Sequence, residues 1–294
     1  MPADGRVAHL QHLQDESPDG ERRQAPATGG RVVLGLALSG GAAHSAASTG
    51  VIEVLDANGI HPDVVVGTSG GAVIGAGYAA GFSAPLIAEL VAAARWDDFG
   101  ALRPGPRLAV YDPAPMIATL RRRFGDVAIE DLPRRFGALA FDLRTARPLL
   151  IDHGPLVPAL RAATAVPLLF PPERVDGHLL GDGSIVSGLP AWAARQLGAT
   201  LVIGVGFGRE ERPQALWTRM RRYVLNAPDR ADEVPDVLIQ PAVQRFHRWR
   251  TVDLDEIIEE GRRAARACLP ALQVALATAG IDPDPPPSVE PSGN

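Results

Sequence analysis

The sequence predicts an α/β fold of three layers (α/β/α), in which helices cover both faces of a mostly parallel central sheet. Short apolar runs without helical periodicity occur at 32–38, 63–66 and 200–205, as expected for strands buried on both faces. Helical patterns follow the first two runs, and a Gly-rich turn separates each of these strands from the next helix. Sites in such sheets lie beyond the carboxyl ends of the strands, so both turns are candidate site loops.

The other elements follow from local signals in chain order. Proline favours helix starts at Pro85 and Pro190, and glycine favours helix ends at Gly59 and Gly198. Helices are therefore expected at 43–58, 72–80, 85–94, 116–123, 155–164, 190–197 and 255–279. Further strands are expected at 136–141, 147–151, 179–180 and 237–239, with irregular structure at 100–115, an extended segment at 167–172, a hairpin turn at Asp176-Gly177 and a loop at 181–183.

Length and composition indicate one globular domain. The chain has 294 residues, 46% of them hydrophobic, which is enough apolar material for a large core and excludes a disordered chain. We expect a flexible leader at 1–30, one folded domain at 31–280 and a Pro-rich tail at 281–294. The leader has no apolar run, and the single cysteine, Cys268, can form no internal disulfide, so a cytoplasmic location is expected.

The charged residues exclude several functions. A net charge of −5 argues against a nucleic-acid partner. The sequence contains no lysine, which removes both a Walker A phosphate loop and Schiff-base chemistry. No cofactor and no metal ion is expected, because no carboxylate cluster has the spacing of a calcium loop.

Three loop motifs carry the candidate chemistry. Gly67-Thr68-Ser69-Gly70-Gly71 lies between a strand and a helix, which is the pattern of a nucleophile elbow; a side chain at Gly67 or Gly71 would clash there. Gly40, Gly41 and Ala42 follow the first strand, and their backbone N–H groups are candidates for an oxyanion hole. Asp182-Gly183-Ser184 follows a short apolar strand and offers an acidic side chain as a base, although a structural turn is the simpler interpretation of an isolated Asp-Gly pair.

In order and spacing, these motifs resemble those of bacterial patatin-like phospholipases. The resemblance covers about 31–205 and includes the Pro-flanked stretch 165–172 before Asp182. It implies a lipid acyl hydrolase in which Ser69 forms the acyl-enzyme and Asp182 acts as its base, without a histidine. It further implies an oxyanion hole at Gly40, Gly41 and Ala42, supported by Gly67, Gly71, Gly183 and His44, with a phospholipid or another acyl ester as substrate.

The oxyanion loop departs from the family pattern. Ala42 stands where the family usually has a third glycine, His44 where it has Arg or Lys, and Ser45 where it has another glycine. A positive φ at Ala42 would cost roughly 1–2 kcal/mol, and His44 would carry charge only when protonated. These changes leave open a second hypothesis, a catalytically weakened fold that binds lipid or protein.

Two other questions stay open. An ordinary α/β-hydrolase would use a triad of Ser69, Asp182 and His247, although the segment 245–250 also fits a basic-aromatic surface strip. Peripheral membrane contact is a modest hypothesis, because aromatic residues interleave with some of the arginine runs. The arginines concerned are Arg121, Arg122, Arg123, Arg134, Arg135, Arg219, Arg221, Arg222, Arg262 and Arg263, and the aromatic residues are Trp217, Tyr223, Phe246 and Trp249.

Overall fold

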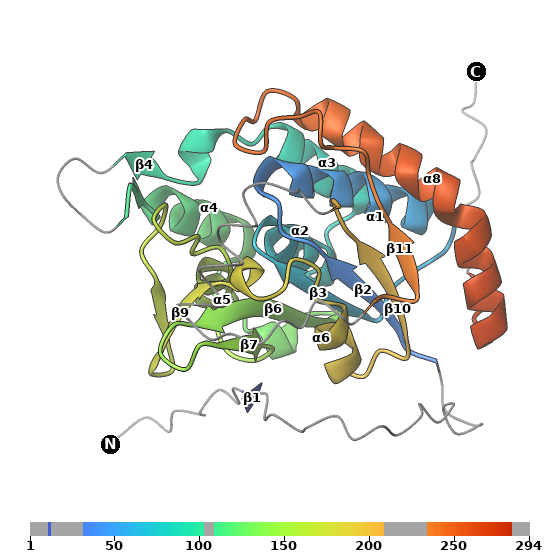
Figure 1. Cartoon of the computed structure of the whole chain (residues 1–294), viewed down its shortest axis with the longest axis horizontal. Helices are drawn as coiled ribbons and strands as arrows, with labels where there is room; N and C mark the ends of the chain where they lie inside the picture. Colours follow the sequence, from blue (N-terminus) through green and yellow to red (C-terminus); the bar gives the residue numbers. More distant parts are fainter. Residues whose placement is uncertain (1–10, 13–31, 103–108, 209–233, 284–294) are drawn as a thin grey trace.

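A mixed sheet runs through the centre of the molecule (Figure 1). The computed structural model describes residues 11–12, 32–102, 109–208 and 234–283. Within these residues, nine strands form one sheet with the main order β1-β7-β6-β3-β2-β10-β11, while β9 pairs with β6 and β8 pairs with β9. The strands are β1 (Gln11–His12), β2 (Leu34–Leu38), β3 (Val64–Thr68), β6 (Arg135–Asp142), β7 (Arg147–Ile151), β8 (Glu173–Val175), β9 (His178–Asp182), β10 (Leu201–Val205) and β11 (Val237–Ile239).

The centre of the sheet is parallel and one side of it is antiparallel. Strands β11, β10, β2, β3 and β6 run parallel to one another. Strands β7 and β9 pair antiparallel with β6, and β8 and β1 extend this side. The expected α/β class with a mostly parallel central sheet is therefore confirmed, with an antiparallel addition on one side.

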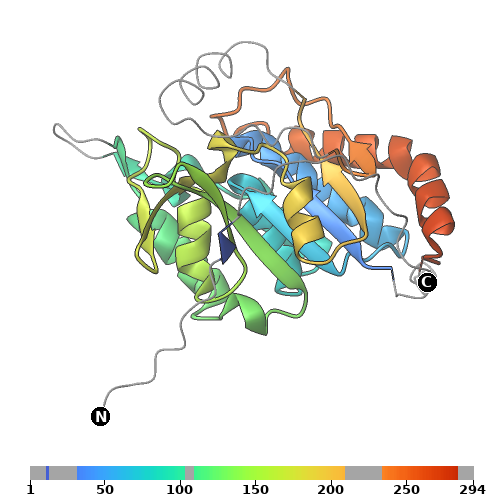
Figure 2. The ribbon, with the colours of Figure 1, turned by 60° about the horizontal axis from the view of Figure 1, so that its bottom comes forward.

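Helices lie on both faces of the sheet. Their bounds are α1 (Ala47–Ala57), α2 (Gly70–Ala79), α3 (Ala84–Ala92), α4 (Ala114–Phe124), α5 (Leu156–Ala163), α6 (Ala191–Gln196) and α8 (Leu254–Ala279). The larger hydrophobic core contains side chains of α1, α2, α5 and α8, and α1 packs against α8. A second core lies across the sheet under α6, which Figure 2 shows on the opposite side from α1.

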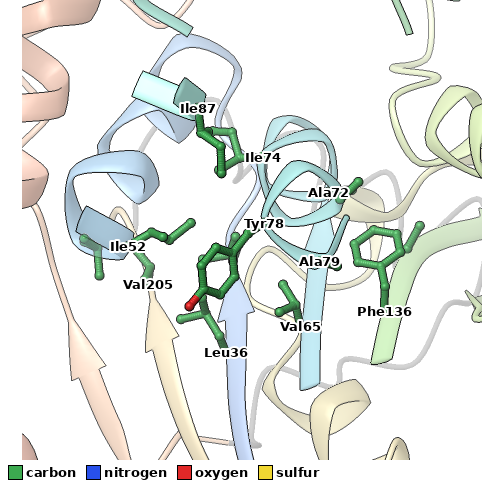
Figure 3. Close-up of a cluster of buried hydrophobic side chains, with 14 of the residues drawn as sticks. Leu36, Ile52, Val65, Ala72, Ile74, Tyr78, Ala79, Ile87, Phe136 and Val205 are labelled. Atoms are coloured by element: carbon green, nitrogen blue, oxygen red, sulfur yellow. The ribbon is translucent and has the colours of Figure 1, made fainter. Parts of the chain in front are cut away.

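Side chains from strands and helices meet in the larger core. Leu36 on β2 and Val65 on β3 lie under Tyr78 of α2 (Figure 3). Ile74 of α2 lies beside Ile87 of α3, above this layer. The strand residues are fully buried, as expected from apolar runs without a polar face. This packing fixes α2, and with it the turn between β3 and α2.

Several local expectations were confirmed or corrected. The hairpin turn at Asp176-Gly177 is confirmed: both residues have positive φ, 47° and 82°, and they join β8 to β9. The segment expected to be irregular, 100–115, contains the short antiparallel pair β4 (Ala101–Leu102) and β5 (Tyr111–Asp112). The prediction of a loop at 181–183 was wrong in part, because pairing with β6 extends β9 through Asp182.

Helix starts account for the remaining differences. The helix expected at 43–58 begins as a 3-10 helix, η1 (Ala42–Ala46), which leads into α1. Helix α4 begins at Ala114 and not at 116, since a proline is tolerated in the first turn, where the N–H groups have no intrahelical acceptor.

The expected extended segment 167–172 is a turn at its start, where Leu168 has φ 70°. The leader except β1, and most of the tail, lie outside the described residues.

Candidate active site

The two Gly-rich loops lie next to each other because their strands are neighbours. Strands β2 and β3 are parallel, with Leu38 opposite Gly67, so both loops leave the same edge of the sheet. A Cβ atom built on Gly40 would lie 3.0 Å from the Cβ atom of Ser69. The sheet therefore brings the candidate oxyanion loop against the candidate nucleophile.

Ser69 occupies a strained turn between β3 and α2. Its φ of 53° and ψ of −128° lie outside the regions that non-glycine residues usually adopt, and such conformations cost on the order of 1–3 kcal/mol. A Cβ atom on Gly71 would lie 2.6 Å from the carbonyl oxygens of Leu38 and Ser39, and one on Gly67 would collide with the backbone of Gly71 and Ala72. The glycines are needed for close backbone contact, as the elbow motif predicted.

Asp182 reaches the same region from the antiparallel side of the sheet. It is the last residue of β9 and pairs with Ala140 of β6, whose neighbour Leu139 pairs with Thr68. Gly183 follows against the carbonyl oxygen of Leu139, where a Cβ atom would collide. Asp182 is fully buried, and its Oδ1 accepts a hydrogen bond of 2.8 Å from the N–H of Ser184.

The second oxygen of Asp182 has no hydrogen-bond partner among the described residues. Burial raises the pKa of this carboxyl group, while the backbone and hydroxyl of Ser184 and the hydroxyl of Ser69 act in the opposite direction. The Ser69 hydroxyl is thus near enough to favour the ionised carboxylate, although no hydrogen bond of regular geometry joins the two side chains. A carboxylate with a raised pKa is a stronger base than one in water.

The candidate oxyanion loop has two N–H groups without an acceptor among the described residues. Gly40 N–H donates to the carbonyl oxygen of Gly188 at 3.1 Å, so this amide is engaged within the fold. In the part of the chain that the structure describes, the N–H groups of Gly41 and Ala42 make no hydrogen bond. Ala42 has φ 51°, so its backbone is in the positive-φ conformation that strains a residue with a Cβ atom.

A distant segment of the chain holds this loop in place. Ala43 N–H donates to the carbonyl oxygen of Arg248 at 2.9 Å, and His44 Nε2 lies 2.8 Å from the carbonyl oxygen of Phe246. His44 is 2% exposed, and its ring packs edge-to-face against Phe207. Because a carbonyl oxygen can only accept, Nε2 must carry a proton, and His44 connects the loop to the segment 246–248.

A mostly apolar cavity of about 300 Å³ opens beside Ser69. Helices α2, α3 and α4 contribute much of its lining, including Val73, Ile74, Ile87, Leu90, Met116 and Leu120. Trp96, the first residue of a 3-10 helix, and Trp249, in a turn, also line it, with ring centroids 5.9 Å apart in an edge-to-face contact. The volume is at the lower end of the range for ligand pockets, roughly 300–1,000 Å³.

His247 does not reach this cavity. Its side chain is exposed, and its Nδ1 accepts a weak hydrogen bond of 3.3 Å from the N–H of Trp249. Arg248 and Trp249 line the cavity, and Trp249 is also exposed, so part of the expected surface strip lies at the cavity. The structure gives no support to a triad with His247.

Sequence reasoning missed the cavity wall and the support behind the oxyanion loop. Positions Gly70, Val73, Ile74 and Gly77 have the three- and four-residue spacing of one helix face, which could have been noticed. The contacts with Phe246 and Arg248 have no local signal, because more than 200 residues separate them from the loop. The described residues contain no cluster of three or more side chains that could hold a metal ion.

The fold and these loops define an α/β protein of the nucleophile-elbow class. A family model described as patatin-like phospholipase matches residues 36–195, more than half of the chain. The chain therefore belongs to the patatin-like phospholipase family, a family of lipid acyl hydrolases.

Similar proteins agree with this family. An uncharacterized NTE family protein of Mycobacterium bovis, Mb2594, is 30% identical over 90% of this chain and 51% of its own length. Another from the same species, Mb1092c, is 34% identical over 60% of this chain and 50% of its own length. Patatin-like phospholipase domain-containing protein 6 of mouse is 28% identical over 68% of this chain and 16% of its own length. The chain thus spans about half the length of the mycobacterial relatives.

A solved structure, VipD from Legionella pneumophila, is also similar. The match has a TM-score of 0.48 and 13% sequence identity, over 82% of this chain and 67% of that one. In the described part of this chain, no helix is both long enough and apolar enough to span a bilayer.

Proposed function

We propose that this protein cleaves carboxylic esters of lipids through an acyl-enzyme on Ser69, with Asp182 as the base. The observation that carries the proposal is the environment of Asp182. One carboxylate oxygen is buried without a hydrogen-bond partner among the described residues, and the hydroxyl of Ser69 is near enough to influence its pKa. Burying a carboxylate costs free energy of folding. This carboxylate has a raised pKa, a buried oxygen without a partner and a serine hydroxyl nearby, which are the properties required of a general base.

The proposed reaction proceeds in two halves. Ser69 Oγ attacks the ester carbonyl carbon while Asp182 Oδ2 takes the hydroxyl proton, and the proton then passes to the departing alcohol. A water molecule next attacks the acyl carbon, Asp182 takes a proton from it, and Ser69 recovers a proton when the fatty acid leaves. No histidine is needed, because the same carboxylate is base and then acid in each half.

The oxyanion is stabilised by two backbone amides in this proposal. The N–H groups of Gly41 and Ala42 make no hydrogen bond among the described residues, whereas Gly40 N–H is bonded to Gly188. Gly40 contributes by allowing close approach to Ser69. In other serine hydrolases, removal of one such donor costs about 3–4 kcal/mol of transition-state stabilisation.

The apolar cavity favours a lipid substrate. A phospholipid or another acyl ester would place its acyl chain among the apolar side chains and its carbonyl group at Ser69. The proposal includes a cytoplasmic site of action with peripheral contact at a membrane. Of the aromatic residues considered for that contact, Trp217 and Tyr223 lie outside the described residues.

The second hypothesis, a fold that binds without turnover, rests on the altered oxyanion loop. The strained φ of Ala42 favours it, since strain at this position could shift the loop. The two available N–H groups and the contacts to Phe246 and Arg248 oppose it. On balance these contacts favour a working hydrolase.

Hydrolysis of a short-chain chromogenic ester tests the proposal. Wild type, Ser69→Ala and Asp182→Asn are compared with two controls, Ser187→Ala and Asp142→Asn, which change a buried serine and a buried carboxylate elsewhere. We expect both site variants to lose at least about a thousandfold in kcat/KM and both controls to stay active. A folded wild type without activity would instead identify a binding protein, and an active Ser69→Ala variant would exclude the acyl-enzyme.

A further inference from the structure

The cavity beside Ser69 follows one face of α2. Gly70, Val73, Ile74 and Gly77 all line it, at positions that repeat along one side of an α-helix. Ile87 of α3 also lines it and lies next to Ile74 (Figure 3). The apolar space therefore extends from Ser69 along α2 toward the C-terminal end of that helix.

Two phenylalanines stand at the far end. Phe82 follows α2, and its ring stacks on that of Phe124 with centroids 5.5 Å apart and planes inclined by 4°. Both residues line the cavity, as do Arg122 and Arg123 next to Phe124. Both arginines are exposed, so a chain that passed beyond the phenyl rings would emerge beside charged groups and water.

The distance between the two ends sets a chain length. The eight residues from Ser69 to Gly77 span about 12 Å along a helix. An extended alkyl chain advances about 1.25 Å per carbon, because C–C bonds of about 1.5 Å zigzag at near-tetrahedral angles. About ten carbons thus fit between the nucleophile and the phenyl pair.

We propose that this cavity holds a single acyl chain of about ten carbons, and that Gly77, Phe82 and Phe124 determine this length. The proposal rests on the proposed function, because it takes the ester carbonyl at Ser69 as the start of the chain. It assigns the enzyme to medium-chain acyl groups. Each methylene that enters the cavity strengthens binding about fourfold, and methylenes beyond the phenyl pair add little.

Gly77 offers a direct way to shorten the cavity. A Cβ atom built there would lie 3.6 Å from Phe82 Cδ2 and 3.7 Å from Ile87 Cγ1, which is ordinary van der Waals contact. A Cβ atom is therefore accommodated at this position, and because Gly77 lines the cavity, the two methyl groups of a valine would take up space at the far end. Gly75, on the same helix, does not line the cavity; a Cβ atom there would lie 3.0 Å from Val65 Cγ1 of the sheet, a tight contact. Gly75→Ala therefore adds bulk to α2 outside the cavity, and its thermal unfolding reports the cost of that contact separately from any change in chain-length profile.

The test measures binding of straight-chain fatty acids by displacement of a fluorescent fatty-acid probe, over lengths from about six to about sixteen carbons. We expect wild-type affinity to rise to about ten carbons and then level off. In Gly77→Val the plateau moves down by about two carbons, in Phe82→Ala and Phe124→Ala it moves up, and in Gly75→Ala it stays. Affinity that rises steadily to the longest acid, or a plateau that none of the three cavity variants moves, would overturn the proposal.

Hydrolysis of the matching ester series separates this inference from the proposed function. Binding that levels off as expected without Ser69-dependent hydrolysis would leave an acyl-binding cavity and reject the enzyme. Ser69-dependent hydrolysis with a flat dependence on chain length would keep the enzyme and reject the length limit. Thermal unfolding of each variant confirms that the changes in profile are measured on folded protein.

Discussion

Replacement of Ala42 by glycine should stabilise the protein, which is the opposite of the usual effect of an Ala→Gly change. Ala42 has φ 51°, in the left-handed region where an L-residue with a Cβ atom is strained by roughly 1–2 kcal/mol. Glycine removes this strain but raises the entropy of the unfolded chain, which costs about 0.4–1 kcal/mol. The net expectation is a gain of about 0.8 kcal/mol in the free energy of unfolding.

The neighbouring residue supplies a control of opposite sign. Ala43 lies in the same 3-10 helix and does not have a positive φ. Ala43→Gly therefore relieves no strain and should lower the free energy of unfolding by about 0.5–1 kcal/mol. Guanidinium denaturation of the wild type and the two variants resolves a difference of this size when the m-values agree.

A shared loss of stability in Ala42→Gly and Ala43→Gly would refute the reasoning. It would mean that the loop relaxes at Ala42 in solution and that the positive φ stores no energy. In thermal unfolding the Ala42→Gly gain corresponds to about 1–2 °C for a chain of this size. Both variants keep the backbone N–H groups, so the comparison isolates the Cβ atom of Ala42.

Three further predictions concern Asp182 and His44. Because burial raises the pKa of Asp182, kcat/KM should rise with pH, and the midpoint of this rise should lie above the ordinary carboxyl pKa of about 4. A midpoint at or below that value in a pH-rate profile would contradict this prediction. The folded state holds the Asp182 proton more tightly than the unfolded chain, so stability falls as pH rises through the window between the two pKa values. Asp182→Asn should therefore unfold at higher denaturant than the wild type at about pH 8, with the gain fading by about pH 4; an equal gain at both pH values would contradict this. His44→Ala should lower kcat more than it raises KM, and His44→Gln, which can still donate to Phe246, should recover part of the loss; equal stability losses without any difference in kcat would assign His44 to the fold alone.

The elements that the sequence predicts well are those with strong local signals. The apolar runs at β2, β3 and β10 and the Asp176-Gly177 turn carry their structure in a few adjacent residues. The elbow belongs with them, because the glycines around Ser69 are required by backbone contacts within the motif itself and with the neighbouring strand end.

Features that depend on distant contacts were not predictable. The positive φ of Ala42 could be weighed only as one of two cases, since alanine by itself does not reveal its backbone conformation. That Asp182 completes β9 depends on pairing with β6, about forty residues earlier in the chain. The cavity arises from α2, α3 and α4 together with several shorter segments, and no one of these segments predicts it.

The segment 246–248 lies outside the residues that the family model matches, but it supports the candidate site. The family model ends at residue 195, yet Ala43 N–H and His44 Nε2 find their acceptors on Arg248 and Phe246. A fragment cut at the family boundary would keep every motif residue and lose the support of the candidate oxyanion loop and one wall of the cavity. In this chain, the smallest piece that keeps the loop supported is therefore larger than the stretch that the family model matches.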